Sequence, residues 1–493
     1  MYLLGIDVGT GGSRAVLVTK EGEVAGTAIE DHVPFDSPEI GWAEQDPLDW
    51  WRATAKAVRK VLSDFNGEIE VGAVGFSGQM HGLVILDQND DVIRPSLIWC
   101  DQRTQKQCDE ITETFGKEKL IELVSNPALT NFTLAKLLWV RDNEPDAYSR
   151  ISSVMLPKDY VRFRLTGKKA TEVSDASGTL ILDVSRRRWS KEILSGLDIS
   201  AEILPDVFES QELCGTVTDA AARETGLKSG TPVVAGAGDN AAGAIGMGIV
   251  RPGQTSMTIG TSGVAFSVTE RPKIDRKGRI HTFCHAVPER WHVTGVTQAA
   301  GLSFRWFREN FAIGHSFDEL VSEAEDVPAG ADGLLWTPYL MGERTPHIDP
   351  ETRASLIGLT ASHTRGHVVR AILEGVAFSL RDCLEVFLES DLEIGKVRLG
   401  GGGAKSSLWR RIQADVYGRT VETITAEEGA AFGAALLAGV GAGVWKSVDE
   451  ACESAIEIAE ELETDEEVGS LLESRYSAYR KIYRAVKPVL AID

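Results

Sequence analysis

Residues 2–19 read YLLGIDVGTGGSRAVLVT, and residues 254–269 read QTSMTIGTSGVAFSVT. In each stretch a Gly-Thr-x-Gly turn, at 9–12 and at 260–263, separates two apolar runs of β-prone residues. This pattern predicts a strand, a tight turn and a second strand. The two turns lie about half the chain length apart, which favours an internal repeat with two similar lobes over chance recurrence of a short pattern.

The segments around these turns predict alternating strands and helices. Asp46 and Pro47 are typical of the first residues of a helix, and an apolar, β-prone run from Val71 to Phe76 follows it. In the second half, the apolar stripe from Val369 to Phe387 predicts a long helix that leads into a strand ending in Gly400-Gly401-Gly402-Gly403. We therefore expect an α/β protein.

Composition excludes several classes of protein. The 493 residues are 43% hydrophobic and 25% charged, which is typical of a folded chain of two or three domains. A formal net charge of −22 argues against nucleic acid or an anionic membrane as the main partner. The first residues lack the basic region of a signal peptide, so we expect a cytoplasmic protein. The acidic run at 460–467 is typical of an exposed helical face.

The cysteines and histidines do not predict a metal centre. The six cysteines are scattered without a Cys-x-x-Cys pair, which indicates neither a zinc site nor a disulfide framework. His281, Cys284 and His285 are the nearest approach to a ligand cluster. The apolar alternation around them predicts a strand, in which His281 and Cys284 face opposite ways.

The two glycine turns can hold a polyphosphate even in an acidic protein. Backbone N–H groups in such turns bind phosphate oxygens, and a divalent cation supplies further positive charge. Thr10 and Thr261 add hydroxyl donors, and Asp7, at the end of an apolar strand, suits a ligand of hydrated Mg²⁺. For either turn alone, an ordinary hairpin turn remains the alternative.

Two common nucleotide motifs are absent or incomplete. No Gly-x-x-x-x-Gly-Lys-Ser/Thr sequence occurs, which excludes a P-loop. Residues 236–241, GAGDNA, follow a predicted strand and resemble a dinucleotide fingerprint. However, the next acidic residue is Glu270, too far on to bind a ribose, and Asp239 would face the pyrophosphate. An NAD-dependent enzyme is therefore a weaker alternative.

Asp239 is the candidate general base. It lies in an apolar, glycine-rich segment without a basic neighbour in sequence, and a carboxylate in such surroundings either caps a helix or does chemistry. Phosphoryl transfer to an alcohol needs a base within hydrogen-bond reach of the hydroxyl, and aspartate is a usual choice. Capping and catalysis are compatible, and the sequence leaves both open.

The ordered set of motifs resembles the FGGY carbohydrate kinases over essentially the full length of the chain. The matching segments are 5–10 (GIDVGT), 78–82 (GQMHG), 156–160 (LPKDY), 236–243 (GAGDNAAG), 259–263 (IGTSG), 342–347 (GERTPH) and 400–404 (GGGGA). Each is weak alone, and their order makes the set specific. The sequence departs from many relatives at Gly11-Gly12 and at Cys100.

The resemblance implies two ribonuclease-H-like lobes of the actin/hexokinase ATPase type around a central cleft. We expect residues 1–246 to form a sugar-binding lobe and residues 247–493 a nucleotide-binding lobe. By the same resemblance Asp239 is the general base, ATP is the phosphoryl donor and Asp7 lies near Mg²⁺. The residues expected near the phosphates or the adenosine are Thr10, Gly11, Gly260, Thr261, Gly401, Gly402, Gly403 and Ala404.

The expected substrate follows from Met80 and His81. Met80-His81 is similar to the xylulokinase pattern, whereas relatives that act on glycerol carry Arg-Glu there. We expect Met80, His81, Asp239 and Asn240 to bind a small-molecule ketopentose, D-xylulose first, with no nucleic-acid or membrane partner. A homodimer fits the family. The alternatives are another kinase of the family, acting on ribulose, gluconate or a deoxyketose, and a non-catalytic sugar sensor that binds nucleotide.

Overall fold

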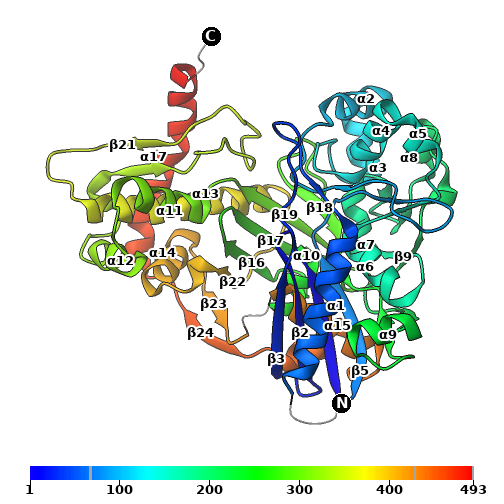
Figure 1. Cartoon of the computed structure of the whole chain (residues 1–493). Coiled ribbons are helices and arrows are strands. Elements are labelled where there is room, and N and C mark those ends of the chain that lie inside the picture. Colours follow the sequence, from blue (N-terminus) through cyan, green and yellow to red (C-terminus); the bar gives the residue numbers. More distant parts are fainter. Residues whose placement is uncertain (66–68, 427–428, 491–493) are drawn as a thin grey trace.

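The computed structural model describes residues 1–65, 69–426 and 429–490, and it contains two lobes, each built on a seven-stranded sheet (Figure 1). The first sheet consists, in spatial order, of β13 (Leu213–Thr216), β14 (Pro232–Val234), β5 (Val71–Gly78), β1 (Tyr2–Val8), β2 (Gly12–Thr19) and β3 (Val24–Asp31), with β15 (Ala237–Gly238) also paired to β5. The second consists of β18 (His281–Cys284), β19 (Trp291–Thr297), β17 (Gly263–Thr269), β16 (Thr255–Ile259), β22 (Val397–Gly401), β23 (Val421–Ile424) and β24 (Ile458–Leu462).

The two sheets contain the same hairpin unit. β1 and β2 pair antiparallel on either side of the first glycine turn, and β16 and β17 do so on either side of the second. In both lobes the first strand of the hairpin also pairs parallel with a later strand, β5 in one and β22 in the other. The predicted internal repeat is therefore present in the structure.

The predicted helices form close to their expected bounds. α1 (Pro47–Ser63) begins where Asp46 accepts the backbone N–H of Leu48 at 2.9 Å, so the acidic cap satisfies a free donor of the first turn. α13 (Arg365–Glu389) is buried along most of its length in the core of the second lobe. Its apolar stripe packs against that sheet, as the sequence pattern predicts.

Helix α15 (Gly429–Gly441) connects the two halves of the chain. It packs on β1 and β5 of the first sheet and against α10 (Asp239–Gly246) (Figure 1). The contact depends on missing side chains: a Cβ at Gly433 would lie 1.9 Å from the carbonyl oxygen of Ala242, and one at Gly5 would lie 1.9 Å from that of Ala431. Glycine therefore allows these backbones to approach so closely. As a result, the helix that carries Asp239 is held by a helix from the other half of the chain.

Most of the acidic run near the C-terminus is not helical, contrary to the sequence interpretation, and its last two residues, Glu466 and Glu467, form the first turn of a helix. Residues 458–462 form β24, an edge strand paired antiparallel with β23, and α17 (Glu466–Leu490) begins after it. Glu461 forms an ion pair with Lys396 at 2.7 Å, and Glu460 forms one with Arg410 at 2.8 Å. Charged side chains are common on exposed edge strands, where they oppose pairing with another chain.

The remaining elements used below are α4 (Thr133–Asn143), α6 (Pro157–Thr166), α7 (Val173–Ala176), β9 (Ala170–Glu172) and α14 (Ser407–Tyr417). Across the described part of the chain, every helix is too short or too polar to cross a membrane.

Candidate active site

Three strands of the first sheet bring two carboxylates to one end of it. Asp7 on β1 is in register with Ser77 on β5, and Ser77 is in turn in register with Ala237 on β15. α10 begins directly after β15, with Gly238 as its N-cap and Asp239 as its first residue. The sheet thus places Asp239 close to Asp7, although the two are far apart in the sequence.

Electrostatics at Asp239 suit a proton acceptor. Burial, and next the negative charge of Asp7, raise the pKa of Asp239 to about 7. Its Oδ1 atom accepts the backbone N–H of Asn240 at 2.6 Å and the Asn240 side-chain amide at 3.0 Å. No described residue forms an ion pair with it. Asp239 is not the N-cap, so its carboxylate is left to face the cleft.

Asp7 fits a cation ligand. Its Oδ1 atom is buried and accepts no hydrogen bond from the described residues, and burial raises the pKa of this carboxyl, with Ser77 and Arg14 opposing the shift. A bound divalent cation would compensate both this orphaned oxygen and the neighbouring Asp239. Residues 1–65, 69–426 and 429–490 contain no cluster of three or more His, Cys, Asp or Glu that could hold a metal. Mg²⁺ is usually bound through one or two carboxylates, with waters and substrate phosphates as its other ligands.

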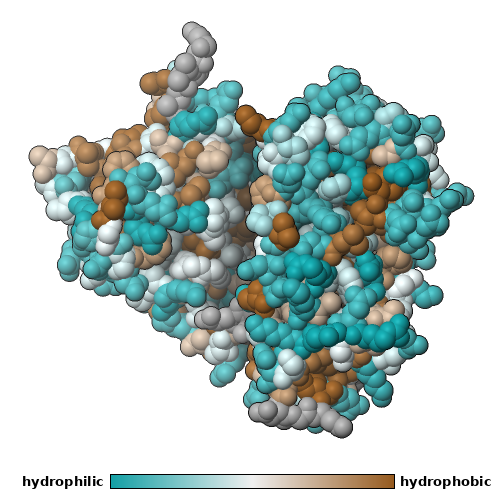
Figure 2. Space-filling view, viewed as in Figure 1, coloured by the Kyte–Doolittle hydropathy of each residue, from teal (hydrophilic) through white to brown (hydrophobic). Residues whose placement is uncertain are grey.

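A cavity of about 620 Å³ lies beside Asp239 between the lobes, where the space-filling view shows a furrow (Figure 2). Its walls come from α10, from β16, β17 and β22 of the second sheet, and from the start of α15. The volume suits a mononucleotide. Of the residues predicted from the sequence, the cavity is lined by Asp239, Asn240, Gly401 and Ala404.

The other predicted nucleotide residues are not among those that line the cavity. Thr10 and Gly11 form the first turn, Gly260 and Thr261 the second, and both turns are closed by a backbone bond, from Gly9 N to Gly12 O and from Gly260 N to Ser262 O. Gly402 is exposed at the end of β22. Gly403 is buried against Ile259, and a Cβ added at Gly403 would lie 2.6 Å from the Ile259 side chain.

The hydroxyl of Thr10 is already hydrogen-bonded within the protein. It accepts the indole N–H of Trp99 at 2.9 Å and donates to the side-chain oxygen of Gln79 at 3.3 Å. A hydroxyl has one proton to donate. The expected bond from this hydroxyl to a phosphate would therefore replace the longer of these two contacts, that with Gln79.

Met80 lies beside Asn240, and His81 is the next residue along the chain. The Asn240 amide contacts Met80 Sδ at 3.8 Å, and Met80 is buried. His81 Nδ1 donates to the carbonyl of Gly178 at 2.7 Å, and burial lowers the pKa of His81 to about 3. The imidazole is therefore neutral with its proton on Nδ1, which leaves Nε2 as a hydrogen-bond acceptor.

A buried ionic network supports the segment before Asp239, and its role was not anticipated from the sequence. Lys158 on α6 lies 2.7 Å from Asp159, 3.3 Å from Glu172 and 3.3 Å from Asp175, and all four side chains are fully buried. Lys158 and Asp159 belong to the LPKDY motif, whereas Glu172 ends β9 and Asp175 lies on α7. The charged residues that stand among apolar ones in α6 are the signal that the sequence offers.

Two side chains connect this network to the backbone just before Asp239. Arg162, beside Asp159 at 3.1 Å, donates to the carbonyl of Ala235. Ser174 Oγ accepts the backbone N–H of Gly238 at 3.0 Å. The backbone on which Asp239 is mounted is thus fixed by charged and polar groups from α6 and α7.

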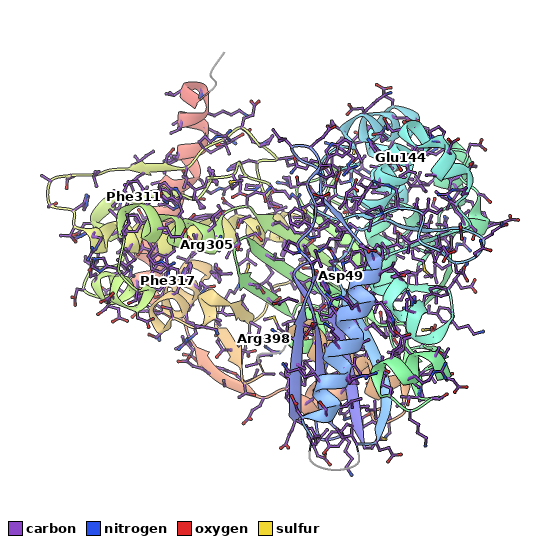
Figure 3. The ribbon with its side chains drawn as sticks, viewed as in Figure 1. Asp49, Glu144, Arg305, Phe311, Phe317 and Arg398 are labelled. Atoms are coloured by element: carbon purple, nitrogen blue, oxygen red, sulfur yellow. The ribbon has the colours of Figure 1, made fainter. Side chains whose placement is uncertain are left out.

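The cavity also contains apolar residues that were not predicted. They are Met247, Val264, Phe266, Leu399 and Ile424. Arg398, on β22, lies between the lobes and donates to the carbonyl of Met247 and to Glu422 at 2.8 Å, so it holds the end of α10 against the second sheet (Figure 3). Phe311 and Phe317 lie on the opposite side of the second lobe, away from the cavity (Figure 3).

Comparison with known proteins identifies the family. Residues 2–246 match the FGGY family of carbohydrate kinases, N-terminal domain, and residues 255–442 match its C-terminal domain. The chain is 43% identical over 433 residues to a xylulose kinase of Bacillus subtilis (strain 168), covering 88% of this chain and 86% of that one. The chain belongs to the FGGY family of carbohydrate kinases.

Solved structures agree with this family. The crystal structure of a xyloylose kinase from Brucella ovis superimposes with a TM-score of 0.93 at 34% identity, covering 99% of this chain and 100% of that one. That of a gluconate kinase from Lactobacillus acidophilus gives 0.93 at 25% identity, covering 98% of each chain. The predicted family and two-lobed actin/hexokinase-type fold are confirmed. The protein is a carbohydrate kinase, and kinases of this family use ATP with Mg²⁺.

Proposed function

We propose that this kinase transfers the terminal phosphoryl group of ATP to D-xylulose, giving D-xylulose 5-phosphate. The observation that carries the proposal is the position of Asp239, beside a nucleotide-sized cavity and next to Asp7, with burial and charge raising its pKa to about 7. A base with a pKa near neutrality ionises at working pH and still takes up a proton readily. Met80 and His81 on the neighbouring segment support a ketopentose.

Each residue then has a separate task. Asp239 accepts the proton of the terminal hydroxyl while that oxygen bonds to the phosphorus and ADP leaves. Asn240 holds the carboxylate through two hydrogen bonds. His81 Nε2 accepts a hydrogen bond from a second sugar hydroxyl, with Met80 packed beneath. Closure of the lobes excludes water, which would otherwise accept the phosphoryl group.

The nucleotide residues are assigned in the same way. We propose that Thr10, Gly11, Gly260 and Thr261 hold the phosphates. We assign the adenosine to Gly401, Gly402, Gly403 and Ala404. Asp7 holds Mg²⁺, which when bound neutralises charge on the phosphates.

The test of the base is Asp239→Asn. The expected result is a fall in kcat of at least ~10²-fold, the lower end for a general base, with D-xylulose binding retained by calorimetry. Asp46→Asn is the matched control, because asparagine also caps a helix and the position is away from the cavity. Near-normal turnover by Asp239→Asn removes the base assignment.

The sugar itself is tested with a panel. ADP release is measured with D-xylulose, ribulose, gluconate and a deoxyketose, and the proposal expects the highest kcat/KM for D-xylulose. A higher value for gluconate assigns the chain to the second activity named among its structural relatives. ADP release with none of the sugars indicates the non-catalytic alternative.

Three further assignments complete the proposal. The lobes are divided at residues 246 and 247, the protein acts in the cytoplasm, and it forms a homodimer. Light scattering of the purified chain tests the dimer, and a single 53.4 kDa species contradicts it.

A further inference from the structure

Lys136 is a fully buried lysine on α4 that hydrogen-bonds to backbone oxygens instead of a carboxylate. Its Nζ donates to the carbonyl of His81 at 3.1 Å and to that of Asn131. Thr133, one turn earlier on the same helix, donates its hydroxyl to the same carbonyl of His81 at 3.2 Å. None of the described carboxylates lies within ion-pair distance of Lys136. Burying an ammonium without a counter-ion costs free energy, so the presence of a lysine at this position needs an explanation other than stability.

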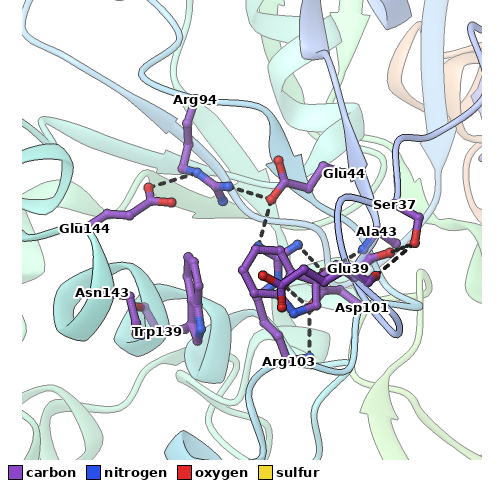
Figure 4. Close-up of polar contacts among 11 residues, drawn as sticks. Ser37, Glu39, Ala43, Glu44, Arg94, Asp101, Arg103, Trp139, Asn143 and Glu144 are labelled. Atoms are coloured by element: carbon purple, nitrogen blue, oxygen red, sulfur yellow. Dashed lines mark hydrogen bonds and ion pairs between the residues drawn. The ribbon is translucent and has the colours of Figure 1, made fainter.

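The nearest acidic charge is already neutralised elsewhere. Asp101 acts on Lys136 electrostatically, but its Oδ2 atom accepts from Arg103 Nη2 at 2.7 Å and from the backbone N–H of Ala43 at 2.7 Å (Figure 4). Arg103 is in turn shared with Glu44 at 2.7 Å (Figure 4). Asp101 is therefore bound to a closer cation, and Lys136 is left with carbonyl oxygens.

The carbonyl that Lys136 holds belongs to a residue with an unusual backbone. His81 has φ 67°, in the left-handed region that a residue with a Cβ rarely adopts. Its ring is fixed by the Nδ1 bond to Gly178 and by edge contact with Phe132 at 5.0 Å between centroids. A left-handed residue needs outside contacts to stay in place, because the conformation itself is unfavourable.

We propose that Lys136 is a positioning residue for sugar recognition: with Thr133 it holds the carbonyl of His81 so that Nε2 of the imidazole faces the sugar. This inference rests on the proposed function, since it assigns His81 to the substrate. Lys136 itself contacts neither sugar nor nucleotide. Loss of the ammonium frees the main chain at residue 81, and the imidazole then samples other orientations.

The pKa of Lys136 separates this role from a stabilising one. Burial lowers the pKa of Lys136 to about 7, while an unfolded chain keeps its lysines near 10.4. The unfolded state therefore binds more protons, and the lysine opposes folding most strongly below pH 7. Apart from burial, the groups that act on Lys136 are Asp101 first and then Cys108, Cys100 and Arg103, and Lys136 in turn lowers the pKa of His81. A methionine fills the same space without this cost.

The test compares two variants of the full chain by steady-state kinetics. Lys136→Met is expected to raise the KM for D-xylulose about tenfold, the loss typical of a charged hydrogen bond, and to leave the KM for ATP unchanged. Thr133→Val is expected to do the same to a smaller extent. The melting temperature of Lys136→Met at pH 6 is expected to equal or exceed that of the wild type. A merely structural lysine would lower it.

Two matched controls use the same substitutions elsewhere. Lys119→Met removes an exposed lysine, and Thr225→Val removes a buried hydroxyl that donates to a backbone carbonyl far from the cavity. Neither is expected to change the KM for sugar.

Three outcomes overturn the proposal. The first is a folded Lys136→Met variant with an unchanged KM for sugar. The second is an equal rise in the KM for sugar and for ATP. The third, independent of activity, is a crystal structure of Lys136→Met in which His81 keeps its left-handed φ and its bond to Gly178. Failure of the proposed function is distinguishable, because the wild type itself would then release no ADP with D-xylulose.

Discussion

Replacing Lys158 by methionine tests how strongly the buried network supports the first lobe. The ammonium lies within 3.3 Å of three carboxylates, on Asp159, Glu172 and Asp175, and none of these side chains is exposed. After the replacement, Arg162, at 3.1 Å from Asp159, is the one cation among the described residues that still contacts the group. Removing one partner of a buried ionic group typically costs ~3–5 kcal/mol, because the remaining charge is uncompensated.

The assay is thermal unfolding, with Lys56→Met as the control. In a lobe of roughly 250 residues each kcal/mol shifts the melting temperature by about 2 °C, so Lys158→Met is expected to lower it by ~6–10 °C. Lys56 carries an exposed ion pair with Glu30 at 3.1 Å, and exposed pairs contribute ~1 kcal/mol or less. The control is therefore expected to shift by at most ~2 °C.

The pH dependence of the melting temperature tests the same reasoning independently. Burial already raises the pKa of Asp175 well above its ordinary value. A carboxylate whose pKa folding raises binds its proton more tightly in the folded than in the unfolded state, so its contribution to stability is lost as pH rises. Without Lys158 this loss grows, so the difference in melting temperature between Lys158→Met and the wild type is expected to be larger at pH 8 than at pH 5. A shift below 2 °C with no pH trend would refute the reasoning.

Three further predictions concern the site and the contact between α10 and α15. Because burial and Asp7 raise the pKa of Asp239 to about 7, kcat/KM is expected to fall about tenfold per pH unit below 7, and a profile flat to pH 5 contradicts this. Gly178→Ala would place a Cβ 2.6 Å from His81 Nδ1, so the KM for sugar should rise while that for ATP stays unchanged; an unchanged KM for sugar argues against His81 as a ligand. Gly433→Ala would clash with the backbone of α10 and is expected to lower the free energy of unfolding by ~1–3 kcal/mol, measured by thermal unfolding. Gly243→Ala has open space around its Cβ and should not destabilise the protein. Equal melting temperatures for the two variants would contradict the packing argument.

Much of the fold follows from local patterns in the sequence. The hairpin at 2–19 was predicted from its glycines and apolar flanks, and β1 has the expected bounds, Tyr2–Val8. Asp46 and Pro47 predicted the start of α1, because capping and the fixed φ of proline act within one turn. The acidic run at 460–467 misled because charge indicates exposure and does not distinguish a helix from an edge strand.

The parts of the site that could not be predicted depend on contacts between distant segments. Nothing local to Lys136 indicates that its ammonium meets the carbonyl of His81, since the pairing requires α4 to lie beside the segment that follows β5. The engagement of the Thr10 hydroxyl by Trp99 and Gln79 has the same origin. In the sequence, the glycine-containing segment of α15 resembles an ordinary apolar helix, and its contact with α10 is seen only in the structure.

By itself the sequence determined the two hairpins, their glycine turns and the repeat, because hydrophobic period, glycine and proline act on neighbouring residues. The family resemblance singled out Asp239 as the candidate base. The tertiary structure alone decided the protonation of these groups. Asp239 has a raised pKa because folding buries it beside Asp7, and His81 is neutral because burial lowers the pKa of its ring, with the hydrogen bond to Gly178 opposing the shift. Burial and the approach of distant charges are properties of the packed chain, and a pKa responds to both.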